Sequence, residues 1–282
     1  MTRSRPAGTN RGSTGRKKPG SADHKRNRNG VRYLFDHWGE VRVELRAAHH
    51  WGLFLDCDGT LVPLRPRPEM ASLAQPQRRI LGRLTRCRRV TVCIVSGRPL
   101  HDLQRVVRVR GVRYAGLYGW ERNGVRRPQG IRRASLIRAK NLLGKRLVRF
   151  PGVWIEDKGM ALGVHYRGVT PSTARRSWTV VRRALKDFQP ALRILPGKKV
   201  WEVLPAEIEG KGRGVRAMLA ELPSGTLPIY VGDDAADEPA FVVLRRGITV
   251  RVGRSRNTRA HYFVHNPDEV FHFLEALGRE MP

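Results

Sequence analysis

Residues 51–61, WGLFLDCDGTL, contain a short apolar run that stops at two aspartates, Asp56 and Asp58, followed by a Gly-Thr pair. The run has no helical alternation, which predicts a buried strand of a parallel sheet. The aspartates would then lie at the carboxyl end of the strand, the edge of an open α/β sheet where ligands bind. A plain strand followed by an Asp-Gly turn is the alternative, because Asp and Gly are common turn residues.

Two carboxylates at such an edge are suited to the transfer of a phosphoryl group. Asp56 would attack phosphorus as a nucleophile and form an aspartyl-phosphate. Asp58 would protonate the leaving oxygen and later activate water. Crowded carboxylates that face a phosphate need a hard cation to offset their repulsion, so we expect Mg²⁺ as a cofactor.

The next apolar run, RVTVCIVSGRP at 89–99, also stops at a small polar residue, Ser96. Ser96 would bind a phosphate oxygen at the start of a helix, where anions are favoured; a simple N-cap role for Ser96 is the alternative. Helices are expected at 72–87 and 100–107, and a third strand at 112–117. Strand, helix, strand, helix, strand predicts a Rossmann-like, doubly wound parallel core.

The character of the sequence changes at 122–206, where we expect an inserted α+β cap domain. VWIEDKGMALGVHYR at 153–167 and LRILPGKKVWEVLP at 192–205 each predict a β-hairpin, and 172–188 predicts a helix between them. The core would therefore consist of residues 31–121 and 207–282, with a lead-in helix or strand at 31–50.

The parallel pattern resumes with a helix at 211–222, a strand that ends at Asp233, a strand in GITVRVG and a closing helix. In GDDAADE, Asp233 would bind the metal directly, beside Asp56 and the backbone of Asp58. Asp237 would bind the metal or orient the other ligands. An acidic cluster that only caps a helix is the alternative.

Lys211 opens the helix after the insertion, where its charge would neutralise the phosphate and the Asp56 carboxylate. The order of DxDGT, a strand ending in Ser, this Lys and GDDxxDE resembles the haloacid dehalogenase (HAD) superfamily of aspartate-nucleophile phosphatases over about residues 51–277. That resemblance implies a Rossmann-like, HAD-like core with a mobile cap, and Mg²⁺ bound beside the nucleophile.

A closer resemblance is to the trehalose-6-phosphate phosphatase family. Its motifs DxDGTL, SGR, GxxGxE, ExK, HYR, KxxEVxP, KG and GDDxxDE match segments that begin at Asp56, Ser96, Gly116, Glu156, His165, Lys199, Lys211 and Gly232. The family often has His where this chain has Tyr118 and Thr where it has Ala236, and neither is a catalytic position. The implied reaction is the hydrolysis of trehalose 6-phosphate in trehalose biosynthesis. Another sugar or polyol phosphate, such as glucosylglycerol phosphate or sucrose 6-phosphate, is the alternative substrate.

By the same resemblance, the substrate would be held by residues of both the core and the cap: Gly97, Arg98, Glu121, Glu156, Lys158, His165, Arg167, Lys199 and Glu202. A cross-strand ion pair between Lys199 and Glu202, worth under about 1 kcal/mol if exposed, is the alternative for those two residues. The alternative for His165 is that it lies on a strand and is simply packed there, without contact to a ligand.

The net charge of +31, from 55 Lys and Arg against 24 Asp and Glu, is unusual for an enzyme of small molecules. Residues 1–30 hold nine basic residues and one acidic residue, with little to bury, and we expect them to form a disordered basic tail. The excess of basic residues predicts non-specific attraction to nucleic acid. The alternative is that these side chains only form a solvated surface. A nucleic-acid-binding protein with a vestigial phosphatase site is the competing class, although no nucleic-acid module is recognisable.

The three cysteines, Cys57, Cys87 and Cys93, form no CxxC pair, so we expect no disulfide framework and no zinc site. Neither an apolar signal segment nor an apolar run long enough to span a membrane is present. We therefore expect a soluble, cytoplasmic monomer that makes no membrane contact. A sugar phosphate is its expected ligand, and a trehalose-6-phosphate synthase is one protein partner that the resemblance leaves open.

Overall fold

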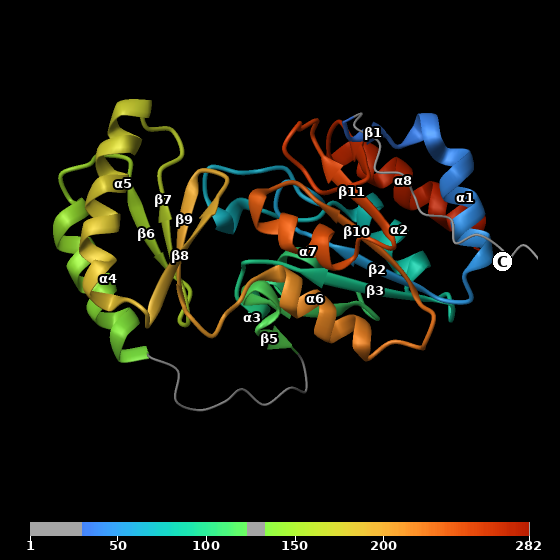
Figure 1. The fold of residues 1–282 in the computed structure, drawn as a ribbon, viewed down its shortest axis with the longest axis horizontal. Coiled ribbons are helices and arrows are strands. Elements are labelled where there is room, and N and C mark those ends of the chain that lie inside the picture. Colours follow the sequence, from blue (N-terminus) through green and yellow to red (C-terminus); the bar gives the residue numbers. More distant parts are fainter. Residues whose placement is uncertain (1–29, 123–132, 282) are drawn as a thin grey trace, which may run out of the picture. The chain divides into compact units, whose positions relative to one another are not determined.

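The computed structural model describes residues 30–122 and 133–281. From Val31 onward the described residues belong to one compact unit with two β-sheets (Figure 1). The predicted tail lies outside the described residues, apart from Gly30. The larger sheet has the order β1-β12-β11-β10-β2-β3-β4-β5, and every neighbouring pair is parallel except β4 and β5. Its strands are β1 (Arg32–Tyr33), β2 (Trp51–Leu55), β3 (Val90–Val95), β4 (Arg113–Gly116), β5 (Glu121–Arg122), β10 (Leu227–Gly232), β11 (Ile248–Val252) and β12 (Tyr262–Val264).

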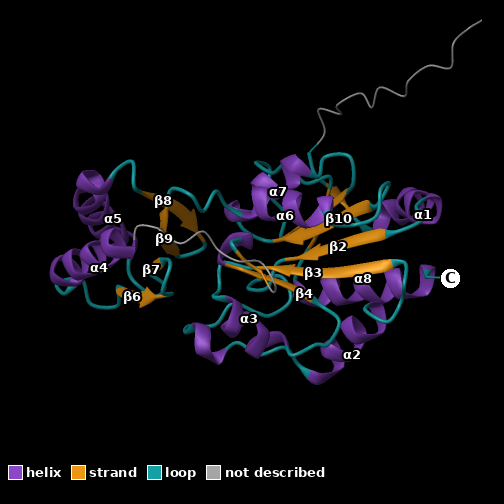
Figure 2. Cartoon of the chain, turned by 90° about the horizontal axis from the view of Figure 1, so that it is seen from below, coloured by secondary structure: helices purple, strands orange, loops and turns teal. Residues whose placement is uncertain are grey.

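Helices cover both faces of this sheet. They are α1 (Trp38–Ala47), α2 (Gln75–Leu84), α3 (Leu100–Val107), α6 (Lys211–Ala220), α7 (Glu238–Val243) and α8 (Pro267–Glu280). Along β2 the side chains alternate: Leu53 and Leu55 join the core cluster of α1, α2, α3 and α8, whereas Phe54 joins that of α6 and α7. Figure 2 shows strands of the sheet between these two layers. The predicted doubly wound α/β core is confirmed.

The smaller sheet forms the cap and is antiparallel throughout, in the order β6-β7-β9-β8. Its strands are β6 (Trp154–Asp157), β7 (Leu162–His165), β8 (Leu192–Gly197) and β9 (Val200–Pro205), and α4 (Arg133–Leu147) packs beside α5 (Pro171–Leu185). On β9, Trp201 and Val203 pack into the helix cluster, and Glu202 between them points to the other face of the sheet. One face of the cap sheet therefore carries two helices, and the other carries polar side chains.

Single turns of 3-10 helix connect several of these elements, at Phe35–His37, Pro68–Met70, Leu117–Gly119, Lys186–Phe188 and Ala235–Asp237. None of the helices in the described ranges is long and apolar enough to cross a membrane. The cytoplasmic location stays a prediction.

The structure contains two helices that we did not expect, α4 and α7. The repeat of Leu136, Leu143 and Leu147 gives α4 its buried face, but Gly144 weakens the helical signal. The limits of the cap, 122–206, stay a prediction. Arg122 pairs with Ala115 in the core sheet, so the chain leaves that sheet only after β5.

Candidate active site

Three neighbouring parallel strands, β10, β2 and β3, end beside one another in the core sheet. Asp233, Asp56 and Ser96 are the first residues after these three strands. The backbone N–H of Asp56 still donates to the carbonyl of Val231 at 2.9 Å, which extends the pairing of β2 with β10 by one residue. The strand order therefore brings the predicted nucleophile, a phosphate ligand and a metal ligand to one edge.

Asp56 is buried and is held by a lysine. Its Oδ1 accepts a hydrogen bond from Lys211 Nζ at 2.6 Å, and its Oδ2 accepts one from Thr60 Oγ1 at 3.4 Å. Burial raises the pKa of Asp56 well above the usual range, and the nearby Lys211 charge opposes that rise. Burial alone would lower the pKa of Lys211, but the Asp237 and Asp56 carboxylates raise it instead. Lys211 thus supplies a positive charge that opposes the effect of burial on the Asp56 carboxyl group.

Asp237 is fully buried and all its partners are donors. Its Oδ1 accepts from Lys211 Nζ at 2.7 Å and from the Tyr230 hydroxyl at 2.6 Å, and its Oδ2 accepts from the Asp234 N–H at 2.9 Å. A Cβ at Gly232 would lie 2.3 Å from the Asp237 carboxyl carbon, so this strand end needs glycine. The three donors fix the position of the Asp237 carboxylate.

Asp233 differs from its neighbours because one oxygen is left without a partner. Oδ2 accepts from Lys198 Nζ at 3.0 Å, whereas Oδ1 is buried with no hydrogen bond in the described part of the chain. Burial, followed by the charge of Asp237, raises the pKa of Asp233 to about 6. Gly59 has a φ of +87°, and a Cβ there would lie 2.2 Å from Asp233 Oδ2. The DxDGT turn therefore depends on Gly59 to approach this carboxylate.

The carboxylates fit a hard cation. Asp56, Asp233 and Asp237 each offer an oxygen, and these oxygens lie within 4.8 Å of one another. Buried carboxylates with an unpartnered oxygen are the donor type that Mg²⁺ takes. Because three donors already occupy Asp237, Asp56 and Asp233 are the residues that would bind the cation directly, and Asp237 would orient the site from behind. The structure does not bring the Asp58 side chain into this group.

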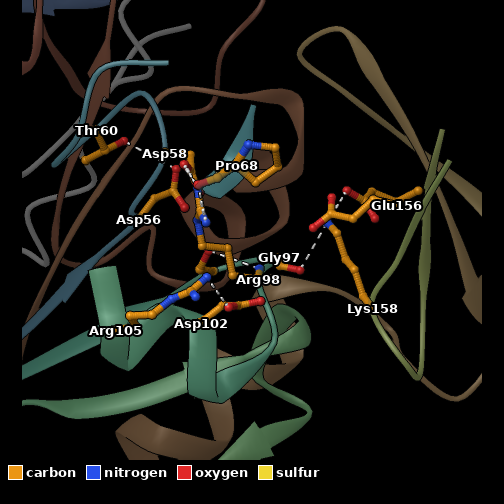
Figure 3. A network of polar contacts seen from close by, with 12 residues as sticks. Asp56, Asp58, Thr60, Pro68, Gly97, Arg98, Asp102, Arg105, Glu156 and Lys158 are labelled. Carbon is orange, nitrogen blue, oxygen red and sulfur yellow. Dashed lines mark hydrogen bonds and ion pairs between the residues drawn. The ribbon is translucent and has the colours of Figure 1, made fainter. Parts of the chain in front are cut away.

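Asp58 instead forms a bidentate ion pair with Arg98. Arg98 Nε and Nη2 each donate to one Asp58 oxygen at 2.7 Å, and Nη1 donates to the Pro68 carbonyl at 3.0 Å (Figure 3). Both residues line the cavity between core and cap. Arg98, expected to contact substrate, therefore fixes the predicted acid and base in place.

Ser96 and Gly97 lie at the base of the same cavity. Ser96 is 1% exposed, and its Oγ accepts from the Arg98 N–H at 3.2 Å, so its hydroxyl hydrogen is available to another acceptor. At Gly97 a Cβ would lie 2.8 Å from the ring carbon and hydroxyl of Tyr118. Gly97 is therefore a place of close packing, as well as part of the lining.

The cap contributes a second polar cluster to this cavity. Lys158 Nζ donates to Glu202 Oε1 at 2.7 Å and to the Gly97 carbonyl of the core at 3.4 Å, and it lies 3.7 Å from Glu156 Oε2 (Figure 3). His165 Nε2 lies 2.8 Å from the same Glu156 oxygen. Burial alone would raise the pKa of Glu156, but the hydrogen bond of His165 and the charge of Lys158 lower it. Glu202 Oε2 is buried with no partner in the described residues, so it is a free acceptor that faces the cavity.

Two residues predicted to bind substrate lie elsewhere. Glu121 is buried, and its Oε2 accepts from the Leu100 N–H at 2.6 Å, so it caps the start of α3 and does not line the cavity. Lys199 has a φ of +68° at the hairpin turn and extends over the Tyr166 ring, away from the cavity. Arg167 does line the cavity, and it donates to the Lys198 carbonyl at 3.2 Å.

Several lining residues were not among the predicted ligands, and two of them, Lys198 and Tyr118, make polar contacts at the site. Lys198, the neighbour of Lys199 in the turn, reaches Asp233 from the cap and also donates its N–H to Asp234 Oδ2 at 2.7 Å. The GKK sequence contains both lysines, and nothing local says which one faces inward. Tyr118 lines the cavity although it has a φ of +62°, and its N–H donates to the Ser96 carbonyl at 2.8 Å. Such strained residues cluster at functional sites, but a backbone angle cannot be read from the sequence.

A buried aspartate with a lysine partner at the carboxyl edge of a Rossmann-like sheet, facing an α+β cap, defines a haloacid dehalogenase-like phosphatase. Solved structures share this fold. The C-terminal domain of Candida albicans trehalose-6-phosphate phosphatase has a TM-score of 0.77 at 21% identity, covering 90% of this chain and 99% of that chain. A haloacid dehalogenase-like hydrolase from Bacteroides thetaiotaomicron has a TM-score of 0.57 at 15% identity, covering 82% and 99%.

Residues 54–268 match the family model described as trehalose-phosphatase, and the chain belongs to the trehalose-phosphatase family. Probable trehalose-phosphate phosphatase H of Arabidopsis thaliana is 31% identical over 252 residues, which cover 80% of this chain and 71% of that protein. The trehalose-phosphate phosphatase of Mycobacterium bovis is 33% identical over 247 residues, which cover 81% and 61%. The predicted family and the predicted class of enzyme, a phosphoric monoester hydrolase, are confirmed.

Proposed function

We propose that this chain hydrolyses trehalose 6-phosphate to trehalose and phosphate, with Mg²⁺ as its cofactor. The observation that carries the proposal is one cavity that joins two clusters. Core residues Asp56, Ser96 and Lys211 line one part, and cap residues Lys158 and Glu202 line the other. A phosphate ester of a sugar needs both parts, because its charged end and its hydroxyl groups require different partners.

At the charged end, Asp56 attacks phosphorus and forms an aspartyl-phosphate, which water then hydrolyses. Lys211 and the Ser96 hydroxyl donate to the phosphoryl oxygens and stabilise the charge that develops on them. Asp58 in its carboxylic acid form, released from the bidentate pair with Arg98, gives its proton to the sugar oxygen as it leaves and takes one back from water in the second step. Bound between Asp56 and Asp233, Mg²⁺ would supply further charge stabilisation.

At the sugar end, the cap offers acceptors and donors already fixed by mutual contacts. Glu202 Oε2 and the Glu156 carboxylate can accept from sugar hydroxyls, and Lys158 can donate to them. His165 is stacked on Trp154 at 4.1 Å between ring centroids, which fixes its orientation toward the cavity. Arg167 and Lys198 would complete the polar wall.

The test is phosphate release from trehalose 6-phosphate beside glucose 6-phosphate, sucrose 6-phosphate and glucosylglycerol phosphate, each with Mg²⁺ and with EDTA. We expect a strong preference for the trehalose ester that requires Mg²⁺, and no turnover by folded Asp56→Asn protein. Preference for another ester would reassign the cap contacts but leave the core chemistry in place. Activity retained by Asp56→Asn would refute the mechanism. The monomeric state and a trehalose-6-phosphate synthase partner stay predictions.

A further inference from the structure

The two cap helices carry an unusual concentration of positive charge. Residues 133–190 contain 13 Lys and Arg against three Asp and Glu. Eleven of these basic side chains lie on α4, on α5 or in the residues that directly follow them, and all eleven residues are exposed. We call them the cap helix face: Arg133, Arg138, Lys140, Lys145, Arg146, Arg149, Arg175, Arg176, Arg182, Arg183 and Lys186.

Acidic neighbours do not neutralise this charge. Neither 133–149 nor 171–186 contains an Asp or Glu. Among the described residues, Lys140 is the member of the cap helix face that forms an ion pair, with Asp157 at 2.8 Å. Asp157 also interacts electrostatically with Arg133. The repulsion among the other nine cations favours the binding of a polyanion across both helices.

The cations also form rows along the helix axes. Arg175 and Arg182, and likewise Arg176 and Arg183, are seven residues apart, which is two helical turns and a rise of about 10.5 Å. α4 and α5 run side by side in Figure 1 and pack against each other. The result is an extended charged surface with no single binding point, which suits a ligand whose charges repeat along its length.

We propose that the cap helix face binds the phosphodiester backbone of nucleic acid. Eight of its eleven residues are Arg, whose planar fork matches phosphate oxygens better than the Lys ammonium does. Binding would be independent of sequence, because contacts to phosphates position a protein but read no bases. This inference does not depend on the proposed phosphatase activity.

An anionic membrane fits the surface less well. An interfacial helix inserts an apolar face between lipids. The apolar faces of α4 and α5, with Leu136, Leu143, Val181 and Leu185, are buried in the cap core, and the exposed Ile137 and Val148 are too few to form such a face. An acidic protein fits less well too, because Arg138 covers the Phe188 ring and Arg149 and Arg176 cover the Phe150 ring, so no free aromatic anchor is offered.

The cap helix face and the catalytic cavity use opposite faces of the same sheet. Val164 and Trp201 pack toward the helices, whereas His165 and Glu202 line the cavity. Nucleic acid on the helices therefore leaves the cavity open. Charge reversal on α5 is expected to change binding without changing phosphatase turnover.

The experiment compares the full chain with two quadruple variants by fluorescence anisotropy, using a labelled duplex DNA in a KCl titration. In one variant Arg175, Arg176, Arg182 and Arg183 are changed to Glu. In the matched control the exposed Arg79, Arg83, Arg86 and Arg88 of the core are changed to Glu, so that both variants lose equal charge and keep the same basic tail.

We expect the α5 variant to lower the slope of log Kd against log[KCl] by roughly 3 to 4, since each phosphate contact contributes about 0.9. The control is expected to lower it by less than about 1. Equal losses in both variants would show that the net charge of the chain binds DNA without a site, which overturns the proposal. Absence of DNA binding by the unchanged protein would overturn it too. So would binding to phosphatidylglycerol vesicles that depends on α5 while DNA binding does not.

Discussion

Replacement of Asp233 by Asn should stabilise the protein when no metal is bound. The Asp233 carboxylate is 4% exposed, and one of its oxygens has no hydrogen-bond partner in the described residues. A bound cation would compensate this buried charge, and without a cation the charge opposes folding. The amide of Asn keeps an acceptor for Lys198 and removes the buried charge.

The magnitude follows from the pKa of Asp233, which burial raises from 3.8 to about 6. An acid whose pKa is higher in the folded state loses stability as pH rises, since the unfolded chain ionises first. At 1.36 kcal/mol per pKa unit, ionisation costs the folded state about 3 kcal/mol above pH 7, and about 1 kcal/mol at pH 4.5. The Asp233→Asn variant should regain these amounts.

Urea unfolding in EDTA at pH 7.5 and pH 4.5 measures this gain, with exposed Asp187→Asn as the matched control. We expect Asp233→Asn to raise the free energy of unfolding by about 3 kcal/mol at pH 7.5, and the control to leave it within about 0.5 kcal/mol. Mg²⁺ at 100 times its Kd should then stabilise the unchanged protein by about 2.7 kcal/mol but not the variant. A variant no more stable than the original protein at pH 7.5, or a gain independent of pH, would refute the reasoning.

Three further substitutions separate the parts of the site. Lys198→Ala should lower kcat/KM for trehalose 6-phosphate about tenfold, a loss of about 1.4 kcal/mol. The matched variant Lys199→Ala should change kcat/KM by less than about twofold, and steady-state kinetics distinguish the two. Equal effects would mean that Lys198 is not the lysine of this turn that faces the cavity. Asp237→Asn removes one of the two carboxylates that pair with the buried Lys211, which keeps Asp56 as its partner. It should lower the free energy of unfolding by about 1 to 3 kcal/mol, which urea titration would detect. Lys158→Met leaves the buried Glu202 carboxylate unpaired and should raise KM at least about tenfold, and an unchanged KM would remove Lys158 from sugar binding.

The catalytic core was predictable from the sequence because its chemistry follows its strands directly. Asp56, Ser96 and Asp233 each come immediately after an apolar run, and parallel strands place their carboxyl ends at one edge. Lys211 was predictable for a similar reason, since it opens a helix that begins at the same edge. Local order along the chain was enough for these residues.

The contacts of the cap residues, and those of core residues such as Arg98 and Glu121, were less predictable because they depend on the direction in which each side chain points. Lys198 and Lys199 are adjacent in a two-residue turn, and only the pairing of β8 with β9 decides which one faces the cavity. Arg98 follows Ser96 in the SGR motif, but its partner Asp58 is 40 residues away. Glu121 is in a family motif, yet its carboxylate caps α3. Such pairings are set by tertiary contacts.

The central claim is that Asp56 becomes phosphorylated by the sugar phosphate. Mass spectrometry of acid-quenched protein, taken during turnover of trehalose 6-phosphate with Mg²⁺, tests it directly. The account predicts one phosphoryl group on the peptide that contains Asp56, absent in EDTA and absent in the Asp56→Asn variant. Turnover with no such adduct, together with activity in Asp56→Asn, would contradict the account.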